Sequence, residues 1–220
     1  EKIVDTSDQW ITERTGIKQR HFAAPEEATS DMSVIAAQRA MEDAGVKPEE
    51  IQLVIVGTAS SDHAFPSTAC LVQDRLGCKN AAAFDLSAGC SGFVYNLAVA
   101  SQMIKTGLYD KALIIGAETL SRIMNFTDRN TCVLFGDGAG AAVVGVVDEG
   151  EGVLGIELGA DGSGGKFLIQ PAGGSRKPAT PETAAAHEHT IHMSGQDVFK
   201  FAIQIMGTAA KRALKAADMK

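Results

Sequence analysis

The chain has 220 residues, of which 45% are hydrophobic and 21% charged, as in an ordinary globular protein of one large or two small domains. Its net charge of −7 argues against a nucleic-acid-binding protein. Glycine, serine or charged residues interrupt every apolar run, so none approaches the roughly 20 residues of a membrane-spanning helix. The four cysteines include no CxxC pair, which fits a reducing compartment, and we expect a cytoplasmic protein.

Apolar runs alternate with helical patterns in the first two-thirds of the chain. The continuous apolar runs predict buried strands at residues 53–56, 81–84 and 112–115. Helices are predicted from an N-cap at Ser30 to Gly45, from Ser67 to about Gly77, and from Cys90 to Gly107. Strands separated by helices indicate βαβ crossovers, and therefore a largely parallel sheet that is covered on both faces.

The last third of the chain is less regular. The apolar runs at residues 139–147 and 153–158, split by a charged turn, predict an antiparallel hairpin. Residues 171–189 are rich in Pro, Gly, Ala and Thr and lack periodicity, which predicts a long surface loop. A final helix is predicted over residues 194–217, with Asp197 placed for a capping-box-like pair.

The charged, glycine-containing turn at residues 148–152 is the expected domain boundary. It would divide the chain into a complete first half, residues 1–149, and the start of a second half, residues 150–220. Because the chain opens on Glu1 rather than Met, we also expect residues before it.

The segment around Cys90 is the strongest candidate for chemistry. A thiol at the N-terminus of a helix feels the positive end of the helix dipole and the unpaired N–H groups of the first turn, which favour the thiolate. Gly89 and Gly92 would permit a sharp turn and the close approach of a substrate carbonyl. The Cys90 N–H could then serve as an oxyanion donor.

On local chemistry alone, two interpretations of Cys90 stay open. The strand–turn–helix setting is similar to a nucleophile elbow but lacks its full signature. Most cysteines in such chains are small buried hydrophobic residues instead, as we expect for Cys70, Cys78 and Cys132.

Other motifs favour structural interpretations. The glycine-rich residues 136–140 precede a predicted strand, so we expect a tight turn there and no dinucleotide-binding loop. Residues 159–165 are expected to be a flexible loop, because no helix or Lys-Ser/Thr pair follows to complete a phosphate site. The candidate metal ligands His187, His189 and His192 lack a cysteine or paired carboxylate, so no metal site is predicted.

Trp10 is the only tryptophan and lies on a short predicted helix that Ser7 could cap. It can pack in the core, or it can lie at a rim beside Arg14 and stack on a nucleobase. His21 and His63 are too isolated in the sequence to be nominated as the base for Cys90.

Residues 85–93 (DLSAGCSGF) resemble the active-site segment of the β-ketoacyl-acyl-carrier-protein synthase III family, the initiating condensing enzymes of bacterial type II fatty-acid synthesis. Further matching segments occur in the family's order at residues 5–11, 14–17, 127–129, 135–141, 192–195 and 198–200. The resemblance implies an α/β thiolase-like fold, in which two βαβαβαββ halves form α/β/α/β/α layers. The second half would be incomplete here.

The resemblance also implies a role for each matching residue. Cys90 would be the catalytic acyl acceptor. The coenzyme A-binding residues would be Thr6, Trp10, Arg14, Arg129 and Gly195, with the adenine between Trp10 and Arg129. The acyl pocket would be lined by Phe135 and Met193, and closed by Phe65 from the other subunit of a homodimer. No metal or resident cofactor is implied, because the coenzyme A thioester is the substrate.

The implied reaction has two steps. Cys90 would accept the acyl group of acetyl-CoA or another short acyl-CoA, and malonyl-acyl-carrier protein would then condense with it to give 3-oxoacyl-acyl-carrier protein. The family's catalytic histidine, in a His-Gln-Ala-Asn segment, and its asparagine have no counterpart in the 220 residues. We therefore expect the chain to be part of a longer enzyme, cut at both ends, and not to condense alone. No nucleic-acid or membrane partner is expected.

Three alternatives remain. Related condensing enzymes of polyketide, quinolone or hydroxymethylglutaryl-CoA synthesis share the cysteine and the fold but differ in the acceptor. A non-condensing fragment could bind acyl-CoA or pair with a chain that carries the second half. A cysteine hydrolase has less support, because no histidine in the sequence is convincingly placed to activate Cys90.

Overall fold

The computed structural model describes residues 2–219, which form two compact units. The sheet unit contains Phe22–Thr119 and Asp137–Leu154, and the terminal unit contains residues 2–21, Leu120–Gly136 and residues 155–219. Each unit is therefore assembled from segments that are distant in the sequence. These units differ from the predicted halves 1–149 and 150–220, and the division into halves stays a prediction.

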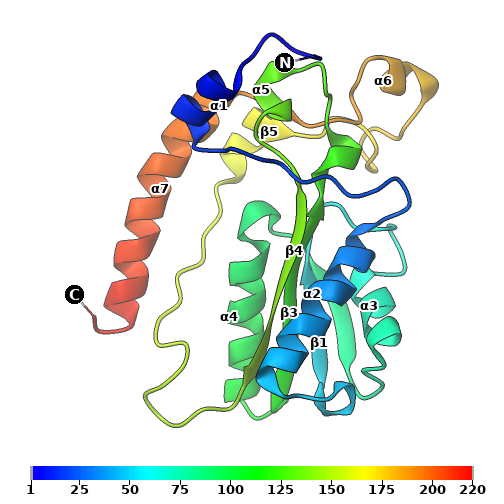
Figure 1. Ribbon diagram of the computed structural model, residues 1–220. Helices are drawn as coiled ribbons and strands as arrows, with labels where there is room; N and C mark the ends of the chain where they lie inside the picture. The colour runs from blue at the N-terminus through cyan, green and yellow to red at the C-terminus, as the bar shows by residue number, and fades with distance from the viewer. Residues whose placement is uncertain (1, 220) are drawn as a thin grey trace. The chain divides into compact units, whose positions relative to one another are not determined.

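The sheet unit is built on a four-stranded sheet with the order β2-β1-β3-β4 (Figure 1). Its strands are β1 (Leu53–Gly57), β2 (Ala82–Leu86), β3 (Lys111–Thr119) and β4 (Asp137–Gly145). β1 lies between β2 and β3 and is parallel to both, whereas β4 is antiparallel to β3. The three predicted strands and the largely parallel sheet are confirmed.

The predicted hairpin is wrong. The run that begins near Ala139 forms β4, which pairs with β3 over its whole length from Asp137 to Gly145. Residues 153–158 contain no strand. The backbone N–H and C=O groups of β4 thus pair with β3, which ends at Thr119, eighteen residues before β4 begins. They do not pair with the segment that follows the turn. The glycines at 136–140, expected in a tight turn, mostly belong to the start of this strand.

Helices cover both faces of the sheet (Figure 1). α2 (Thr29–Ala44) and α3 (Thr68–Leu76) pack on one face, and α4 (Gly92–Lys105) packs on the other. Successive residues of a strand point to opposite faces, so β1 contributes Val54 and Val56 to the first core and Leu53 and Ile55 to the second. All four side chains are fully buried, which explains why β1 reads as a continuous apolar run.

The ends of α2 and α3 agree with the sequence except at one cap. α3 follows Ser67 as predicted, and Ser67 caps it, because its hydroxyl accepts a hydrogen bond from the backbone N–H of Cys70. α2 begins at Thr29, so Ser30 lies inside the helix and Ala28 occupies the cap position. There the carboxylate of Asp31 accepts a hydrogen bond from the Ala28 N–H at 2.7 Å, which replaces the predicted serine cap.

The terminal unit contains smaller elements and one long helix. They are α1 (Asp8–Thr15), α5 (Arg129–Cys132), β5 (Leu168–Ile169), α6 (Pro181–Ala185), β6 (His192–Met193) and α7 (Gly195–Ala216). β5 pairs with β6 in an antiparallel ribbon. The predicted loop over residues 171–189 contains α6, and its ends are joined by the hydrogen bond from Ala172 N–H to Glu188 O. The expected flexible loop near residue 162 includes a 3₁₀ helix, Gly162–Phe167.

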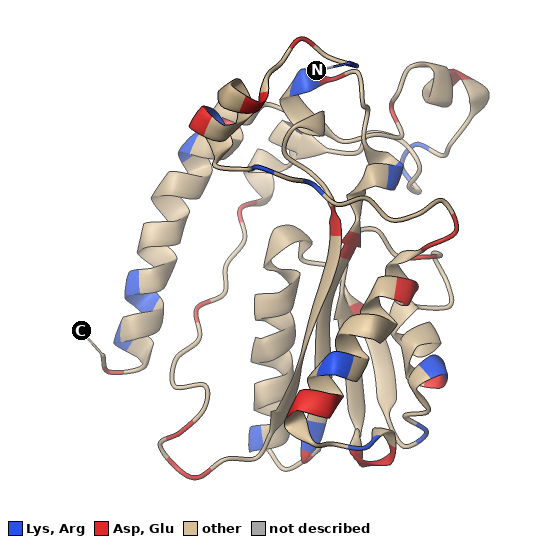
Figure 2. Cartoon of the chain, viewed as in Figure 1, with Lys and Arg blue, Asp and Glu red and all other residues tan. Residues whose placement is uncertain are grey.

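α7 confirms the predicted final helix, and its cap residue Ser194 donates a hydrogen bond to Asp197 at 2.5 Å. Basic residues lie on its C-terminal half, where they complement the helix dipole (Figure 2). None of its described residues is buried. Among residues 2–219, the structure contains no helix that is both long and apolar enough to cross a membrane.

Candidate active site

Cys90 lies in a tight turn between β2 and α4. The turn is a 3₁₀ helix, Gly89–Ser91, that runs directly into α4 at Gly92, and the cysteine is exposed. Gly89 has a φ of +51°, in the left-handed region where a side chain is strained. The turn that presents Cys90 therefore requires a glycine at position 89 for its backbone conformation.

Gly92 has a packing role that the sequence did not predict, while its expected role beside a substrate carbonyl stays a prediction. Its φ of −51° is ordinary for a helix, but a Cβ added to Gly57 would lie 2.9 Å from the carbonyl carbon of Gly92. The two glycines thus let the first turn of α4 approach the end of β1 at backbone contact. A larger residue at position 92 would therefore interfere with the packing of α4 against the sheet.

The other cysteines differ in their surroundings. Cys78 is buried as predicted, Cys132 is half-buried, and Cys70 is exposed, so the expectation for Cys70 is wrong. Cys70 lies in the first turn of α3, where its thiol is in hydrogen-bonding contact with the hydroxyl of Ser67. Burial raises the pKa of the Cys78 thiol to about 11, with a smaller contribution from the charge of Glu49.

Trp10 lies in the terminal unit with two guanidinium groups over its ring. Ser7 caps α1 by accepting a hydrogen bond from the Trp10 N–H at 3.1 Å. The Cζ atoms of Arg14 and Arg129 lie 4.8 and 5.0 Å from the centroid of the indole. Arg129 also donates a hydrogen bond to the carbonyl of Asp5 at 2.8 Å. We call Trp10, Arg14 and Arg129 the Trp10 clamp.

The segment before α1 supplies a further polar group. The hydroxyl of Thr6 is buried and has no hydrogen-bond partner among the described residues. Its neighbour Asp5 holds Arg129 through the main-chain carbonyl, a contact that no side-chain pattern in the sequence could reveal. The two residues therefore place one free hydroxyl and one occupied carbonyl on the same short segment.

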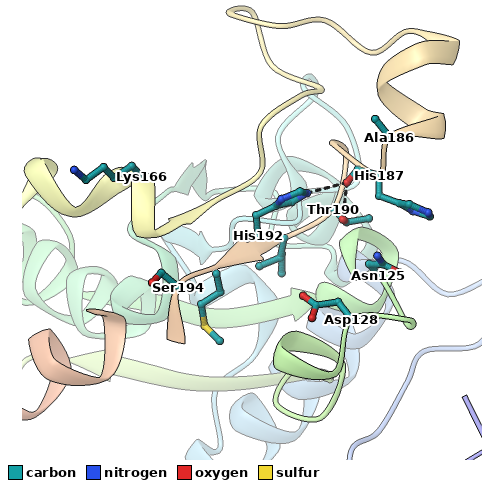
Figure 3. A pocket seen from close by; sticks show the side chains of 10 residues that line it. Asn125, Asp128, Lys166, Ala186, His187, Thr190, His192 and Ser194 are labelled. Atoms are coloured by element: carbon teal, nitrogen blue, oxygen red, sulfur yellow. Dashed lines mark hydrogen bonds between the residues drawn. The ribbon is translucent and has the colours of Figure 1, made fainter. Parts of the chain in front are cut away.

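A cavity of about 440 Å³ lies elsewhere in the terminal unit (Figure 3). Its lining includes Lys166, His192, Met193 and Ser194, and the ring of His192 is hydrogen-bonded to the main-chain oxygen of His187 at 3.1 Å. Figure 3 shows Lys166 and Ser194 on one side of this ring and His187 on the other. Within the part of the chain that the structure describes, no three His, Cys, Asp or Glu residues are grouped so that they could hold a metal ion.

The remaining candidate residues lie as follows. Met193 belongs to β6 and lines the cavity, and a Cβ added to Gly195, the first residue of α7, would lie 3.8 Å from the Met193 methyl group. Phe135 is half-buried in the terminal unit. Phe65 is 87% exposed and belongs to the sheet unit, as Cys90 does.

Comparisons with known proteins agree with one another. The family model described as 3-oxoacyl-[acyl-carrier-protein (ACP)] synthase III matches residues 84–162. A β-ketoacyl-[acyl-carrier-protein] synthase III from Caldanaerobacter subterraneus subsp. tengcongensis is 61% identical over 215 residues, which cover 98% of this chain and 65% of the relative. The chain belongs to the β-ketoacyl-[acyl-carrier-protein] synthase III family.

Solved structures show the fold of this family. The 3-oxoacyl-[acyl-carrier-protein] synthase III of Aquifex aeolicus VF5 has a TM-score of 0.87 at 43% identity, and the match covers 100% of this chain and 66% of that one. The priming β-ketosynthase from the R1128 polyketide biosynthetic pathway has a TM-score of 0.88 at 34% identity, with 100% and 64% covered. The predicted α/β thiolase-like fold is confirmed. The chain spans about two-thirds of the length of these relatives.

One buried polar residue near Cys90 was missed in the sequence. Asn96 is completely buried in α4 and belongs to the same helical face as Phe93, Ala100 and Ile104. The sequence did carry a signal for this residue, because Asn96 follows Phe93 by three residues and so interrupts the apolar face of the predicted helix.

Proposed function

We propose that this protein transfers a short acyl group from coenzyme A to Cys90, and that the whole protein then condenses it with malonyl-acyl-carrier protein. The observation that carries the proposal is the exposed Cys90 on a glycine-dependent turn at the start of α4, within the segment that matches the family. The N-terminus of a helix stabilises negative charge, which suits both a thiolate and the oxyanion that its attack creates.

The acyl transfer balances without a further reactant. The Cys90 sulfur attacks the thioester carbonyl carbon, a tetrahedral oxyanion forms, and the bond from that carbon to the coenzyme A sulfur breaks. The thiol proton ends on the departing coenzyme A, and the acyl group ends on Cys90. Loss of carbon dioxide from malonyl-acyl-carrier protein then gives an enolate that attacks the acyl carbon, which releases Cys90 and 3-oxoacyl-acyl-carrier protein.

The Trp10 clamp is proposed to bind the adenine of coenzyme A. An indole and a guanidinium both offer a flat face to a purine. A purine between them needs about 3.5 Å on each side, roughly 7 Å in all, whereas Arg129 lies 5.0 Å from the ring centroid. For adenine to enter, Trp10 and Arg129 must therefore move apart by about 2 Å. Thr6 offers a free hydroxyl to the same ligand.

The remaining roles are proposed from the family's pattern. Phe65, with most of its surface exposed, would close the acyl pocket of the partner in a homodimer. Phe135, Met193 and Gly195 would lie along the acyl and pantetheine path. A cytoplasmic location follows from the substrates and remains part of the proposal.

The likeness to the polyketide priming ketosynthase favours a second candidate, a condensing enzyme that primes another pathway. The chemistry at Cys90 would be the same, and the acceptor or primer would differ. Parallel condensation assays with malonyl-acyl-carrier protein and malonyl-CoA, each with a panel of acyl-CoA primers, distinguish the two candidates.

Mass spectrometry after brief incubation with acetyl-CoA tests the acyl transfer. We expect one acetyl group, confined to the Cys90 peptide, in the wild type and in Cys70→Ala, and none in Cys90→Ala. Acetylation that persists in Cys90→Ala, or a folded wild type that stays unmodified, would refute the proposed role of Cys90.

A further inference from the structure

Asn96 is an unusual residue in the core of the sheet unit. Its side chain is fully buried, and its amide nitrogen donates a hydrogen bond to the main-chain oxygen of Ile115 in β3 at 2.9 Å. Its amide oxygen is buried without a hydrogen-bond partner among the described residues. A buried, unsatisfied acceptor destabilises a fold, and an apolar side chain would avoid that penalty. A contribution to the stability of the fold therefore does not by itself explain why asparagine occupies position 96.

The hydrogen bond of Asn96 acts near the N-terminal end of α4, which directly follows the turn that contains Cys90. Asn96 lies one turn beyond Gly92, which contacts Gly57 through the backbone. A Cβ added to Gly57 would lie 2.8 Å from the Asn96 nitrogen, so the amide fills the space beside this contact. A Cβ added to Gly116 would likewise lie 3.2 Å from the Cβ of Phe93.

Three contacts thus fix the first turns of α4 against two strands. Two of them, at Gly57 and at Gly116, are steric and only prevent closer approach. The third, from Asn96 to Ile115, is directional, because a hydrogen bond weakens steeply when its angle changes. Of these three contacts, the hydrogen bond is the one whose energy depends on the direction in which the helix end meets the sheet.

We propose that Asn96 is a positioning residue for Cys90: its hydrogen bond to β3 fixes the rotation and register of the first turns of α4, and thereby aims the thiol in the preceding turn. This inference rests on the proposed acyl transfer to Cys90. Asn96 touches no substrate in this scheme and acts only through the placement of the helix. A misplacement of about 1 Å in a reacting group can lower a rate by about 100-fold, so a directional anchor can matter for the reaction.

The test compares Asn96→Ala and Asn96→Ser with the matched control Ser101→Ala. Ser101 lies on the same helix, and its hydroxyl donates to Ala98 O at 3.0 Å, a hydrogen bond internal to α4. The two Asn96 variants lose the reach to β3, whereas the control loses only a bond within the helix. Two variants are used so that a folded one is available, with folding checked by circular dichroism.

Single-turnover acetylation of Cys90 is measured against acetyl-CoA concentration. For the Asn96 variants we expect the maximal rate to fall by about 10- to 100-fold, with an unchanged half-saturating concentration, because the groups proposed to bind the nucleotide are untouched. For Ser101→Ala, both the maximal rate and the half-saturating concentration should stay within about twofold of the wild-type values. A folded Asn96 variant with a wild-type maximal rate, or a loss equal to that of Ser101→Ala, overturns the inference.

Alkylation by iodoacetamide separates this inference from the proposed function, because it needs no acyl-CoA. The exposed Cys70 on α3 is the internal reference. The ratio of Cys90 to Cys70 alkylation should fall by about two- to fivefold in the Asn96 variants, the size of a helix-terminus effect on a charge. An unchanged alkylation ratio overturns the positioning role of Asn96, whether or not the wild type accepts an acyl group. A reduced ratio supports that role even if the wild type accepts no acyl group.

Discussion

Replacement of Gly89 by alanine isolates the backbone of the Cys90 turn. A Cβ at this position would meet no atom within 4 Å, so the change adds no clash. Its φ of +51° is the only source of strain. A non-glycine residue in this region costs about 1–2 kcal/mol, and the loss of freedom in the unfolded chain returns about 0.4–1 kcal/mol. From the midpoints of these ranges we expect a net destabilisation of about 0.8 kcal/mol.

Gly77 provides a matched control in the same unit. It ends α3 with a φ of +75°, and a Cβ added there would also meet nothing within 4 Å. Gly77→Ala should therefore lower the free energy of unfolding by a similar amount, which corresponds to roughly 2–3 °C in Tm for a chain of this size. Only Gly89→Ala should also slow the acetylation of Cys90, because the strained turn relaxes by moving the thiol.

Urea unfolding and single-turnover acetylation, measured on both variants, test this reasoning. Gly89→Ala that is as stable as the wild type would show that position 89 is not held in the left-handed conformation. Equal losses of acetylation rate in Gly89→Ala and Gly77→Ala would show that stability, and not the geometry of the turn, controls the reaction.

Three further predictions concern other parts of the chain. Trp10 is the only tryptophan, so coenzyme A should change its fluorescence whereas pantetheine, which lacks the adenine, should not; equal responses would contradict adenine binding at the clamp. The backbone hydrogen bond from Ala28 and the nearby Arg75 hold the pKa of Asp31 below its ordinary 3.8, so this carboxylate stabilises the fold above that pH and loses the effect as the pH falls through its folded-state pKa. Asp31→Asn should therefore lower Tm at pH 7, and a Tm difference that persists unchanged well below pH 3.8 would contradict this. Burial raises the pKa of Cys78 to about 11, so a thiol reagent at pH 8 should label the exposed cysteines first and Cys78 only on unfolding; rapid labelling of Cys78 in the folded protein would refute its burial.

Local signals predicted most of the sheet unit. The strands β1 and β3 were found because their residues are buried on both faces and read as continuous apolar runs. The partner of β4 was missed because pairing is a long-range property, and adjacency in sequence favoured a hairpin with residues 153–158. α6 was missed although Thr180 and Pro181 carry a helix-start pattern, since the surrounding composition was typical of a loop.

The candidate site was predictable to different degrees. Trp10 and Arg14 are four residues apart on α1, so their contact follows from helix geometry. Arg129 lies far along the chain, and only the resemblance to a family linked it to Trp10. The contact of Gly57 with Gly92 and the anchor at Asn96 depend on how α4 packs on β1 and β3, which no local pattern specifies.

The distribution of these groups between the two units makes the proposed chemistry separable. Cys90, Gly89 and Asn96 belong to the sheet unit, and Trp10 with Arg129 belongs to the terminal unit. A change around Cys90 alters the orientation and the electrostatic surroundings of the nucleophile. Both affect the stability of the transition state, so the change should lower the maximal acetylation rate. A change in the Trp10 clamp removes binding that is equal in the ground state and the transition state, so it should raise the half-saturating acetyl-CoA concentration alone. If Trp10→Ala instead lowered the maximal rate, the clamp would be using its binding free energy to orient the thioester, and the division of roles between the two units would be wrong.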